Sequence, residues 1–187
     1  MKIDVLDKGY IEVVDKLGDD LTPVNAARVS FGGRSEDFTE KDKRLSKFLI
    51  KHKHFSPFRH QHVMMIIKAP EFVLRQWYKH IVEGQLEGFE AGTAKNIYED
   101  HMRLTIQHYD ALLMKGVAKE QARILLPLSQ YTQVWWTASF QSIMNFIELR
   151  DEPTSQVEIQ EYARALKTIM LDTFPETTKL WSETYWK

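Results

Sequence analysis

Alternating apolar and polar positions at the start of the chain predict a pair of short strands. Ile3 and Val5 form a first apolar run, and Ile11 and Val13 form a second, with the polar residues Asp7–Gly9 between them. Two such runs joined by a tight turn are typical of a β-hairpin. We therefore expect two short strands at the beginning of the chain.

Two later segments also predict strands. Val63–Ile67 is apolar at both alternating sets of positions, a pattern that suits a strand covered on both faces. Tyr131–Thr137 is rich in aromatic and β-branched residues, which favour extended structure.

The rest of the chain shows helical periodicity with start signals. Thr22 and Pro23 suit a helix cap and a first helical position, Thr39 with Asp42 resembles a capping box, and Ser139 suits another cap. We expect helices, in chain order, over Val24–Val29, Thr39–His52, Glu71–His80, Ala94–Lys115, Ala118–Leu126 and Ser139–Leu149, and one last long helix after Pro153 that carries Ile159, Ala163, Leu166 and Met170 on one side.

These elements predict one domain over residues 1–187, of the α+β or α/β class, with helices flanking a modest sheet. The composition of 43% hydrophobic and 27% charged residues agrees with an ordinary globular protein. The net charge of −1 argues against a protein that coats nucleic acid. No apolar run approaches the length of a membrane span, and Met1–Asp4 shows no signal-peptide core, so we expect a cytoplasmic protein without a membrane partner.

The absence of cysteine excludes disulfides, thiolate metal sites and cysteine nucleophiles. The pairs His52/His54 and His60/His62 suit metal ligands if each pair lies on a strand, because positions i and i+2 then share a face. No carboxylate lies within that stretch to complete a hard-metal site, so we expect no metal.

Several cationic residues are candidates for anion binding. Lys43–His62 holds six Lys or Arg and no acid, which makes it either an anion site or a solvated helix face. The helix from Glu71 places its apolar residues on one side and offers Arg75, Gln76 and Lys79 on the other, as donors for a phosphate or a pyrimidine or as an exposed cationic face. Arg123 either pairs with Glu120 or binds a ligand, and Arg150 either complements its helix dipole or binds a ligand.

Five segments, read in order, resemble the flavin-dependent thymidylate synthases, and the resemblance covers the chain except for about residues 83–96. The matching segments are Asn25–Phe31 (NAARVSF), His52–Phe58 (HKHFSPF), Lys68–Trp77 (KAPEFVLRQW), Ala122–Leu128 (ARILLPL) and Met144–Arg150 (MNFIELR).

The resemblance implies the family's fold, with a small and mostly antiparallel sheet, and a homotetramer with active sites where subunits meet. It implies FAD as cofactor, dUMP as substrate, methylenetetrahydrofolate as carbon donor and NADPH as reductant. The lack of cysteine agrees with this family, because the other kind of thymidylate synthase attacks the uracil ring with a cysteine thiolate.

The resemblance also assigns residues by position. Arg150 matches the arginine that contacts uracil and favours ionisation of its N3, which makes it the expected catalytic residue. His54 matches a histidine near the flavin, although a core histidine is the alternative, and Ser139 and Gln141 depart in identity from the family pattern. The expected dUMP-binding residues are Gln76, Lys79, Arg123 and Arg150, and the expected FAD-binding residues are His54, Ser56, Lys79, His80, Ile81, Ser139, Gln141 and Asn145.

One departure from the family is large. The family signature is Arg-His-Arg, seven residues and then Ser, whereas this chain has Lys79-His80-Ile81 with Phe89 at the serine position. No serine occurs between Ser56 and Ser129 and no arginine between Arg75 and Arg103, so the family substrate loop is missing near residues 82–93.

Two explanations for the missing loop are open. We favour the explanation that the protein has a mobile substrate loop which the printed sequence leaves out, so that the residue numbers run on across it. The alternative is that the loop is truly deleted from the protein. A true deletion predicts a relative that binds flavin or nucleotide with impaired or altered activity, for example hydroxymethylation. A third hypothesis, an interaction protein that binds nucleic acid through Lys43–His62, has only the local basic charge in its favour.

Overall fold

The computed structural model describes residues 1–78 and 91–186, and within them four strands form one sheet in the order β1-β2-β3-β4. The β1–β2 and β2–β3 pairs are antiparallel. The strands are β1 Lys2–Val5, β2 Gly9–Leu17, β3 His62–Pro70 and β4 Tyr131–Ser139. A small, mostly antiparallel sheet flanked by helices confirms the predicted fold class.

The described residues divide into two compact units. The first comprises residues 1–69 and 133–187, and its helices are α1 Leu21–Arg28, η1 Val29–Phe31, α2 Glu40–Lys51, η2 Ser56–Arg59, α6 Phe140–Arg150, α7 Val157–Thr173 and α8 Pro175–Tyr185. The second comprises residues 70–132, with α3 Glu71–Tyr78, α4 Ala91–Met114, α5 Lys119–Ala122 and η3 Arg123–Leu125. The single domain over residues 1–187 stays a prediction, and most of the segment near 82–93 lies outside the described residues.

The predicted hairpin is confirmed as β1 and β2, which pair from Lys2 with Glu12 to Val5 with Gly9. Glycine is required at the start of β2, because a Cβ there would lie 2.0 Å from the hydroxyl oxygen of Tyr162 on α7. That hydroxyl donates to the carbonyl oxygen of Lys68, 2.7 Å away. The missing side chain thus lets α7 approach the sheet.

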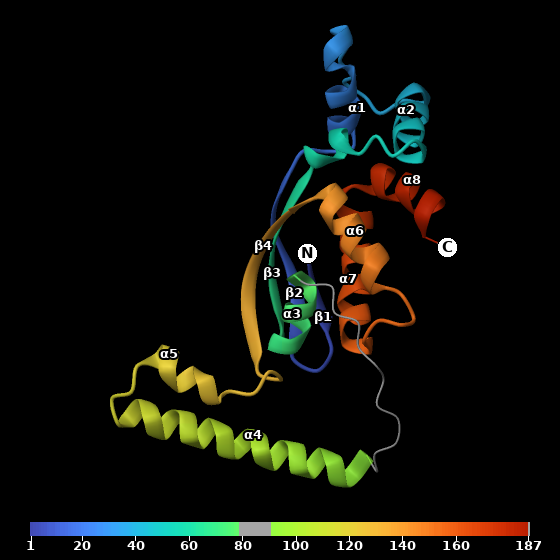
Figure 1. Cartoon of the computed structure of the whole chain (residues 1–187). Helices are drawn as coiled ribbons and strands as arrows, with labels where there is room; N and C mark the ends of the chain where they lie inside the picture. The colour runs from blue at the N-terminus through green and yellow to red at the C-terminus, as the bar shows by residue number, and fades with distance from the viewer. Residues whose placement is uncertain (79–90, 187) are drawn as a thin grey trace. The chain divides into compact units, whose positions relative to one another are not determined.

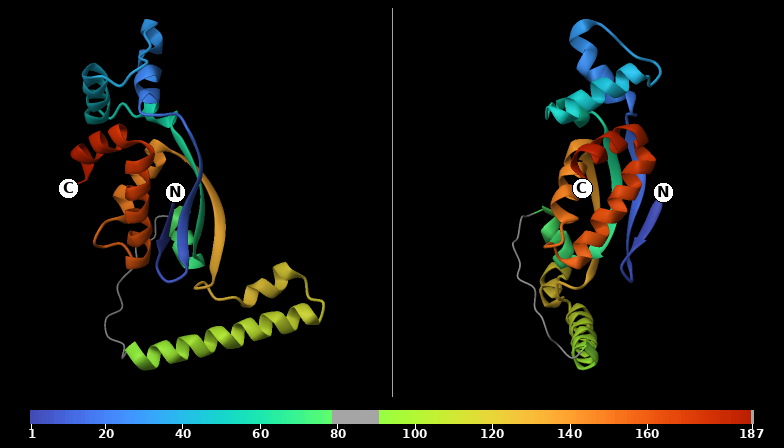
Figure 2. Two further views of the ribbon diagram at one scale, coloured as in Figure 1. Left: turned by 180° about the vertical axis from the view of Figure 1, so that it is seen from behind. Right: turned by 90° about the vertical axis from the view of Figure 1, so that its right-hand side faces the viewer.

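The helices α6 and α7 lie side by side over one face of the sheet (Figure 1, Figure 2). Val63, Met65 and Ile67 of β3 are fully buried, whereas the alternate residues of this strand are only half-buried. The prediction that both faces of β3 are covered is therefore confirmed in full on one face, that of Val63, Met65 and Ile67, and in part on the other.

The core of the first unit continues beyond the sheet into an aromatic cluster. The ring centroid of Phe140 lies 5.9 Å from that of Phe58 and 5.6 Å from that of Trp181, and all three side chains are buried. These rings join η2, α6 and α8, three elements that are far apart in the sequence.

Two neighbouring aspartates accept hydrogen bonds at the starts of two helices of the first unit, α1 and α8. Asp19 Oδ1 accepts hydrogen bonds from the backbone N–H groups of Leu21 and Thr22, both at 3.0 Å. Asp20 Oδ1 accepts from the N–H of Thr177 at 2.8 Å, and its Oδ2 accepts from that of Glu176 at 3.2 Å, at the start of α8. The predicted cap at Thr22 is wrong: α1 begins at Leu21, and Asp19 supplies the bonds.

The other predicted helix boundaries have mixed outcomes. The capping box of Thr39 and Asp42 is present at the start of α2. The last long helix is confirmed as α7, in which Ile159, Ala163, Leu166 and Met170 are all fully buried. The helix α8, which begins at Pro175 after Phe174 leaves helical geometry, was not predicted.

The second unit begins where α3 follows β3. The N–H groups of Glu71 and Phe72 donate to the carbonyl oxygens of Gln130 and Leu128, at 3.1 and 2.9 Å. The apolar face of α3 is confirmed, but Gln76, expected on the polar face, is only 5% exposed. No helix within residues 1–78 and 91–186 is long and apolar enough to cross a membrane.

Candidate active site

The short helix η2 and the helix α6 with its cap form a junction that holds four of the eight expected FAD-binding residues. The N–H of Phe140 donates to the carbonyl oxygen of Gln61 at 2.8 Å, and the packed rings of Phe58 and Phe140 lie beside this bond. Ser56 begins η2, while Ser139 and Gln141 lie at the start of α6. The structure thus brings together residues that are more than 80 positions apart in the sequence.

Ser139 caps α6, as predicted. Its Oγ accepts a hydrogen bond from the N–H of Ser142 at 3.2 Å and lies 2.9 Å from the Ser142 hydroxyl. Gln141 and Asn145 are one turn apart and share one side of the helix. Gln141 is half-buried and Asn145 is exposed, so both amides are available at the surface of the junction.

Arg59, the last residue of η2, is a member of this junction that the sequence did not single out. Its Nε donates to Oε1 of Gln141 at 2.7 Å. In the sequence Arg59 counted only as one of six cations in Lys43–His62. Its place three residues after Ser56, an expected FAD contact, was the available signal.

His54 is exposed, so the alternative of a core histidine is wrong. Its ring is nearly parallel to that of Phe48, with centroids 6.2 Å apart and planes 14° apart. Neither predicted histidine pair lies on one strand: His52 and His54 follow α2, and only His62 belongs to β3. The geometric basis of a metal pair is therefore wrong, and the described residues contain no group of three or more metal-ligating side chains.

Arg150 is the last residue of α6 and only 9% exposed. Burial lowers the pKa of its guanidinium from the ordinary value of an arginine. An arginine nevertheless keeps its proton at neutral pH. Its place suits the dipole of α6, and its burial provides a fixed positive charge with little surrounding water.

The expected dUMP-binding residues are divided between the two units. Gln76 and Arg123 belong to the second unit, where Gln76 is buried and Arg123 is exposed. The predicted ion pair between Glu120 and Arg123 does not occur in the part of the chain that the structure describes. Lys79, His80 and Ile81, which were expected to bind dUMP or FAD, lie outside the described residues.

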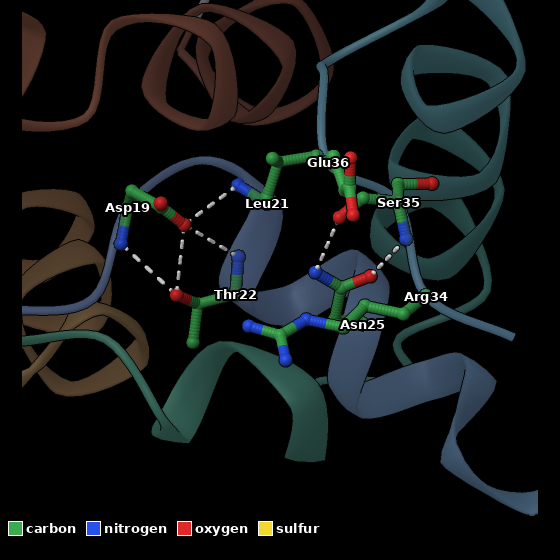
Figure 3. Close-up of a pocket in the computed structure, with 7 residues that line it drawn as sticks. All are labelled: Asp19, Leu21, Thr22, Asn25, Arg34, Ser35 and Glu36. Atoms are coloured by element: carbon green, nitrogen blue, oxygen red, sulfur yellow. Dashed lines mark hydrogen bonds between the residues drawn. The ribbon is translucent and has the colours of Figure 1, made fainter. Parts of the chain in front are cut away.

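A polar cavity of about 640 Å³ lies beside α1, and none of the residues that line it was among the site residues expected from the sequence. Asn25 spans one side, with its Nδ2 donating to the Ser35 carbonyl oxygen at 3.0 Å and its Oδ1 accepting from the Ser35 N–H at 2.7 Å (Figure 3). These bonds engage one N–H and the carbonyl oxygen of the Asn25 amide within the protein. The lining residues are Asp19, Leu21, Thr22, Asn25, Arg34, Ser35 and Glu36.

The basic stretch Lys43–His62 lies mostly at the surface. Arg44, Lys47 and Lys51 are exposed on α2, and Lys47 pairs with Glu183 of α8 at 3.2 Å. This arrangement favours the interpretation of a solvated helix face, with Arg59 as the exception described above.

Comparison with known proteins finds a family that covers most of the chain. The model of the family described as thymidylate synthase complementing protein matches residues 12–87 and 81–176. The flavin-dependent thymidylate synthase of Thermotoga neapolitana is 40% identical over 201 aligned positions, covering 95% of this chain and 92% of that protein. The one from Thermus thermophilus is 34% identical, covering 94% of this chain and 76% of that protein.

Solved structures share the fold. A UMP/dUMP methylase, PolB from Streptomyces cacaoi, bound with 5-Br dUMP, superposes with a TM-score of 0.83 at 23% identity and covers 98% of both chains. Its complex with 5-Br UMP gives 0.78 at 24% identity with the same coverage.

Proposed function

We propose, given that this chain belongs to the flavin-dependent thymidylate synthase family, that it is a cytoplasmic enzyme that methylates dUMP to dTMP. The observation that carries the proposal is the 40% identity to the Thermotoga neapolitana enzyme across 95% of this chain. Methylenetetrahydrofolate is the proposed carbon donor, and NADPH is the proposed reductant.

The residues at the junction of η2 and α6 fit FAD. Ser56, Arg59, Gln141 and Asn145 offer a hydroxyl, a guanidinium and two amides, which are the donors and acceptors that phosphates and a flavin ring require. When bound, FAD supplies hydride transfer between NADPH and the transferred carbon. The protein's own part is to bind and orient the reactants and to stabilise charge.

Arg150 is the proposed catalytic residue because its buried guanidinium brings fixed positive charge. Such a charge beside the uracil ring stabilises the ring after loss of the N3 proton. Gln76 and Arg123 are proposed to hold the nucleotide, Gln76 through its amide and Arg123 through its charge. His54 is proposed to lie near the flavin, where its stacking with Phe48 restrains the ring.

The first test is the purified protein itself. We expect a yellow protein with a flavin absorption spectrum, NADPH oxidation that dUMP stimulates, and dTMP as the product found by chromatography. A colourless protein that takes up no added FAD would contradict the proposal.

A second test concerns Arg150. The Arg150→Ala variant should lose about 100-fold or more in kcat/KM, the range found when one electrostatic donor is removed from an active site. The matched control is Arg44→Ala, an exposed arginine on α2, which should keep the parent's rate. Thermal unfolding of each variant shows whether Arg150→Ala is still folded, and activity within twofold of the parent would reject the role.

A second candidate function is a relative that binds flavin and nucleotide but turns over poorly or makes a different product, such as hydroxymethylated dUMP. The family model matches in two pieces that meet at residues 81–87, which supports a missing segment there. An intact mass of 22.0 kDa would establish a true deletion. FAD binding without dTMP, or a product whose mass includes the extra oxygen, would favour this candidate.

A homotetramer is the proposed assembly. On the sheet of the first unit, Leu17 and Trp135 are each 64% exposed, although both are large apolar side chains. Apolar surface of this kind is typical of subunit interfaces. Light scattering during gel filtration should give four times the chain mass, and a monomer with full activity would contradict active sites built between subunits.

A further inference from the structure

One nitrogen of the Arg59 guanidinium is hydrogen-bonded within the protein, and its two terminal nitrogens have no hydrogen-bond partner among the described residues. Its Nε donates to Gln141 Oε1 at 2.7 Å, and Arg59 makes no other hydrogen bond or ion pair with the residues that the structure describes. A guanidinium held through Nε keeps its two terminal nitrogens side by side as a fork. That fork matches the spacing of two phosphate oxygens.

The charge of Arg59 is not neutralised by its surroundings. Its partner Gln141 is a neutral amide, and no acid occurs between Lys43 and His62. The first turn of α6 also contains no acid, so the positive end of that helix dipole adds to the charge of the junction. Arg59 is itself exposed, and its hydrogen bond near the start of α6 is with the neutral amide of Gln141.

We infer that Arg59 binds a phosphate of the FAD diphosphate and that Gln141 is the residue that positions it. This inference rests on the proposed function. Ser56 and Asn145, both expected FAD contacts, lie on the same two elements. Residues 76–102 contain no arginine, so an arginine fork for the phosphate would have to come from another part of the chain. Arg59 supplies it from η2.

The decisive measurement is the affinity of the apoprotein for FAD, followed by flavin fluorescence. Arg59→Ala should weaken FAD binding about 10- to 100-fold, the range for a lost hydrogen bond to a charged group. Arg59→Lys keeps the charge but not the fork and should fall between Arg59→Ala and the parent. The control Arg44→Ala should bind FAD as the parent does, since Arg44 is an exposed cation of the same basic stretch.

The KM for dUMP tests whether Arg59 binds a phosphate of FAD or the phosphate of dUMP. At saturating FAD, the KM for dUMP should change less than twofold in Arg59→Ala. A raised KM for dUMP with an unchanged FAD dissociation constant would assign the fork to the substrate and overturn the inference. Added salt should weaken FAD binding less steeply in Arg59→Ala than in the parent, because one ionic contact has been removed.

The Gln141→Glu variant tests whether Gln141 positions Arg59 for FAD or only links η2 to α6. A carboxylate keeps the link between η2 and α6 but neutralises Arg59, so the variant should unfold at the parent's temperature or above it. FAD binding should nevertheless weaken about tenfold, within the range for charged hydrogen bonds. In the Arg59→Ala background the same substitution should weaken FAD binding by a smaller factor, because the loss that acts through Arg59 has already occurred. An equal loss in both backgrounds would show that Gln141 does not act through Arg59.

These outcomes also separate two failures. A parent protein that takes up no FAD overturns the proposed function and this inference with it. A parent that binds FAD no more tightly than Arg59→Ala overturns the inference alone.

Discussion

Two arginines in the first unit join different elements, and they do so in opposite ways. Arg28 at the end of α1 contacts the carboxylate of Asp42 on α2 and the hydroxyl of Ser35, and Asp42 is 1% exposed. Arg59 at the end of η2 contacts a neutral amide on α6 and is exposed. The first cation is neutralised where it lies, whereas the second keeps its charge at the surface. The difference separates an arginine that stabilises the fold from one that is available to a ligand.

The network around Asp42 shows why the first arrangement is structural. Burial by itself would raise the pKa of Asp42, but hydrogen bonds from the side chain and N–H of Thr39, from Ser35 and from Arg28 outweigh it and hold that pKa well below its usual range. Every donor comes from the protein, and the network links α1, the segment after η1 and α2. A buried polar network stabilises a fold only when its members are satisfied in this way.

The largest expected effect is the loss of the Asp42 carboxylate. Asp42→Ala should lower the free energy of unfolding by about 3 kcal/mol, because it leaves Arg28 and two hydroxyl groups without their acceptor. Urea unfolding measures the change, and Asp37→Ala is the control because Asp37 is an exposed acid of the same segment. Equal stability of the two variants would remove the distinction between Arg28 and Arg59.

Acid should weaken the same network without a substitution. Because the pKa of Asp42 is lower in the folded than in the unfolded protein, its contribution to stability is complete above about pH 4 and is lost as the pH falls through the folded value. Urea unfolding of the parent and of Asp42→Asn from pH 6 downward should show two free energies that converge in acid. A constant difference across that range would contradict the lowered pKa.

A smaller effect is expected at Ser35, which donates its hydroxyl proton to Asp42 at 2.8 Å. Ser35→Ala should cost about 1 kcal/mol of unfolding free energy, the usual value for one intramolecular hydrogen bond. Ser30→Ala, at an exposed serine of η1, serves as the control in the same urea unfolding experiment. A loss as large as that of Asp42→Ala would mean that Ser35, and not the carboxylate, holds the network together.

The smallest effect on stability is expected at Arg59. Arg59→Ala should change the free energy of unfolding of the apoprotein by less than about 0.5 kcal/mol, since an exposed polar contact contributes little. Urea unfolding without FAD checks this. A loss of about 3 kcal/mol or more, the range for breaking a buried charge pair, would make Arg59 a second structural arginine and remove its contrast with Arg28.

Local signals predicted much of this fold, and contacts distant in sequence account for most of what the patterns missed. The capping box of Thr39 with Asp42 and the cap at Ser139 were predicted correctly because both partners lie within four residues. The start of α1 was wrong because a threonine before a proline looks like a cap, while the bonds come from Asp19. The helix α8 was missed because the apolar spacing was followed only as far as Met170, within α7.

The candidate site divides in the same way. The family resemblance pointed to Ser56, Ser139 and Gln141, and the structure places them at one junction. It could not point to Arg59, because the hydrogen-bond partner of Arg59 is 82 residues away in the sequence. Without that partner, Arg59 cannot be told apart from the other cations of the basic stretch. The burial of Gln76 was missed because amphipathic spacing places a glutamine on the solvent-exposed face of a helix.

Because Asp19 and Asp20 are consecutive and bind two different helix starts, the chain should not tolerate an inserted residue between them. They anchor the beginnings of α1 and α8, and Asp20 reaches Thr177 across 157 positions of sequence. Replacing either aspartate removes the hydrogen bonds at one helix start. Inserting a single residue between them would change the spacing of the two carboxylates, so that they could no longer reach both helix starts at once. Insertions should therefore be better accommodated at Gly32–Gly33, where the chain is exposed, than at this dipeptide.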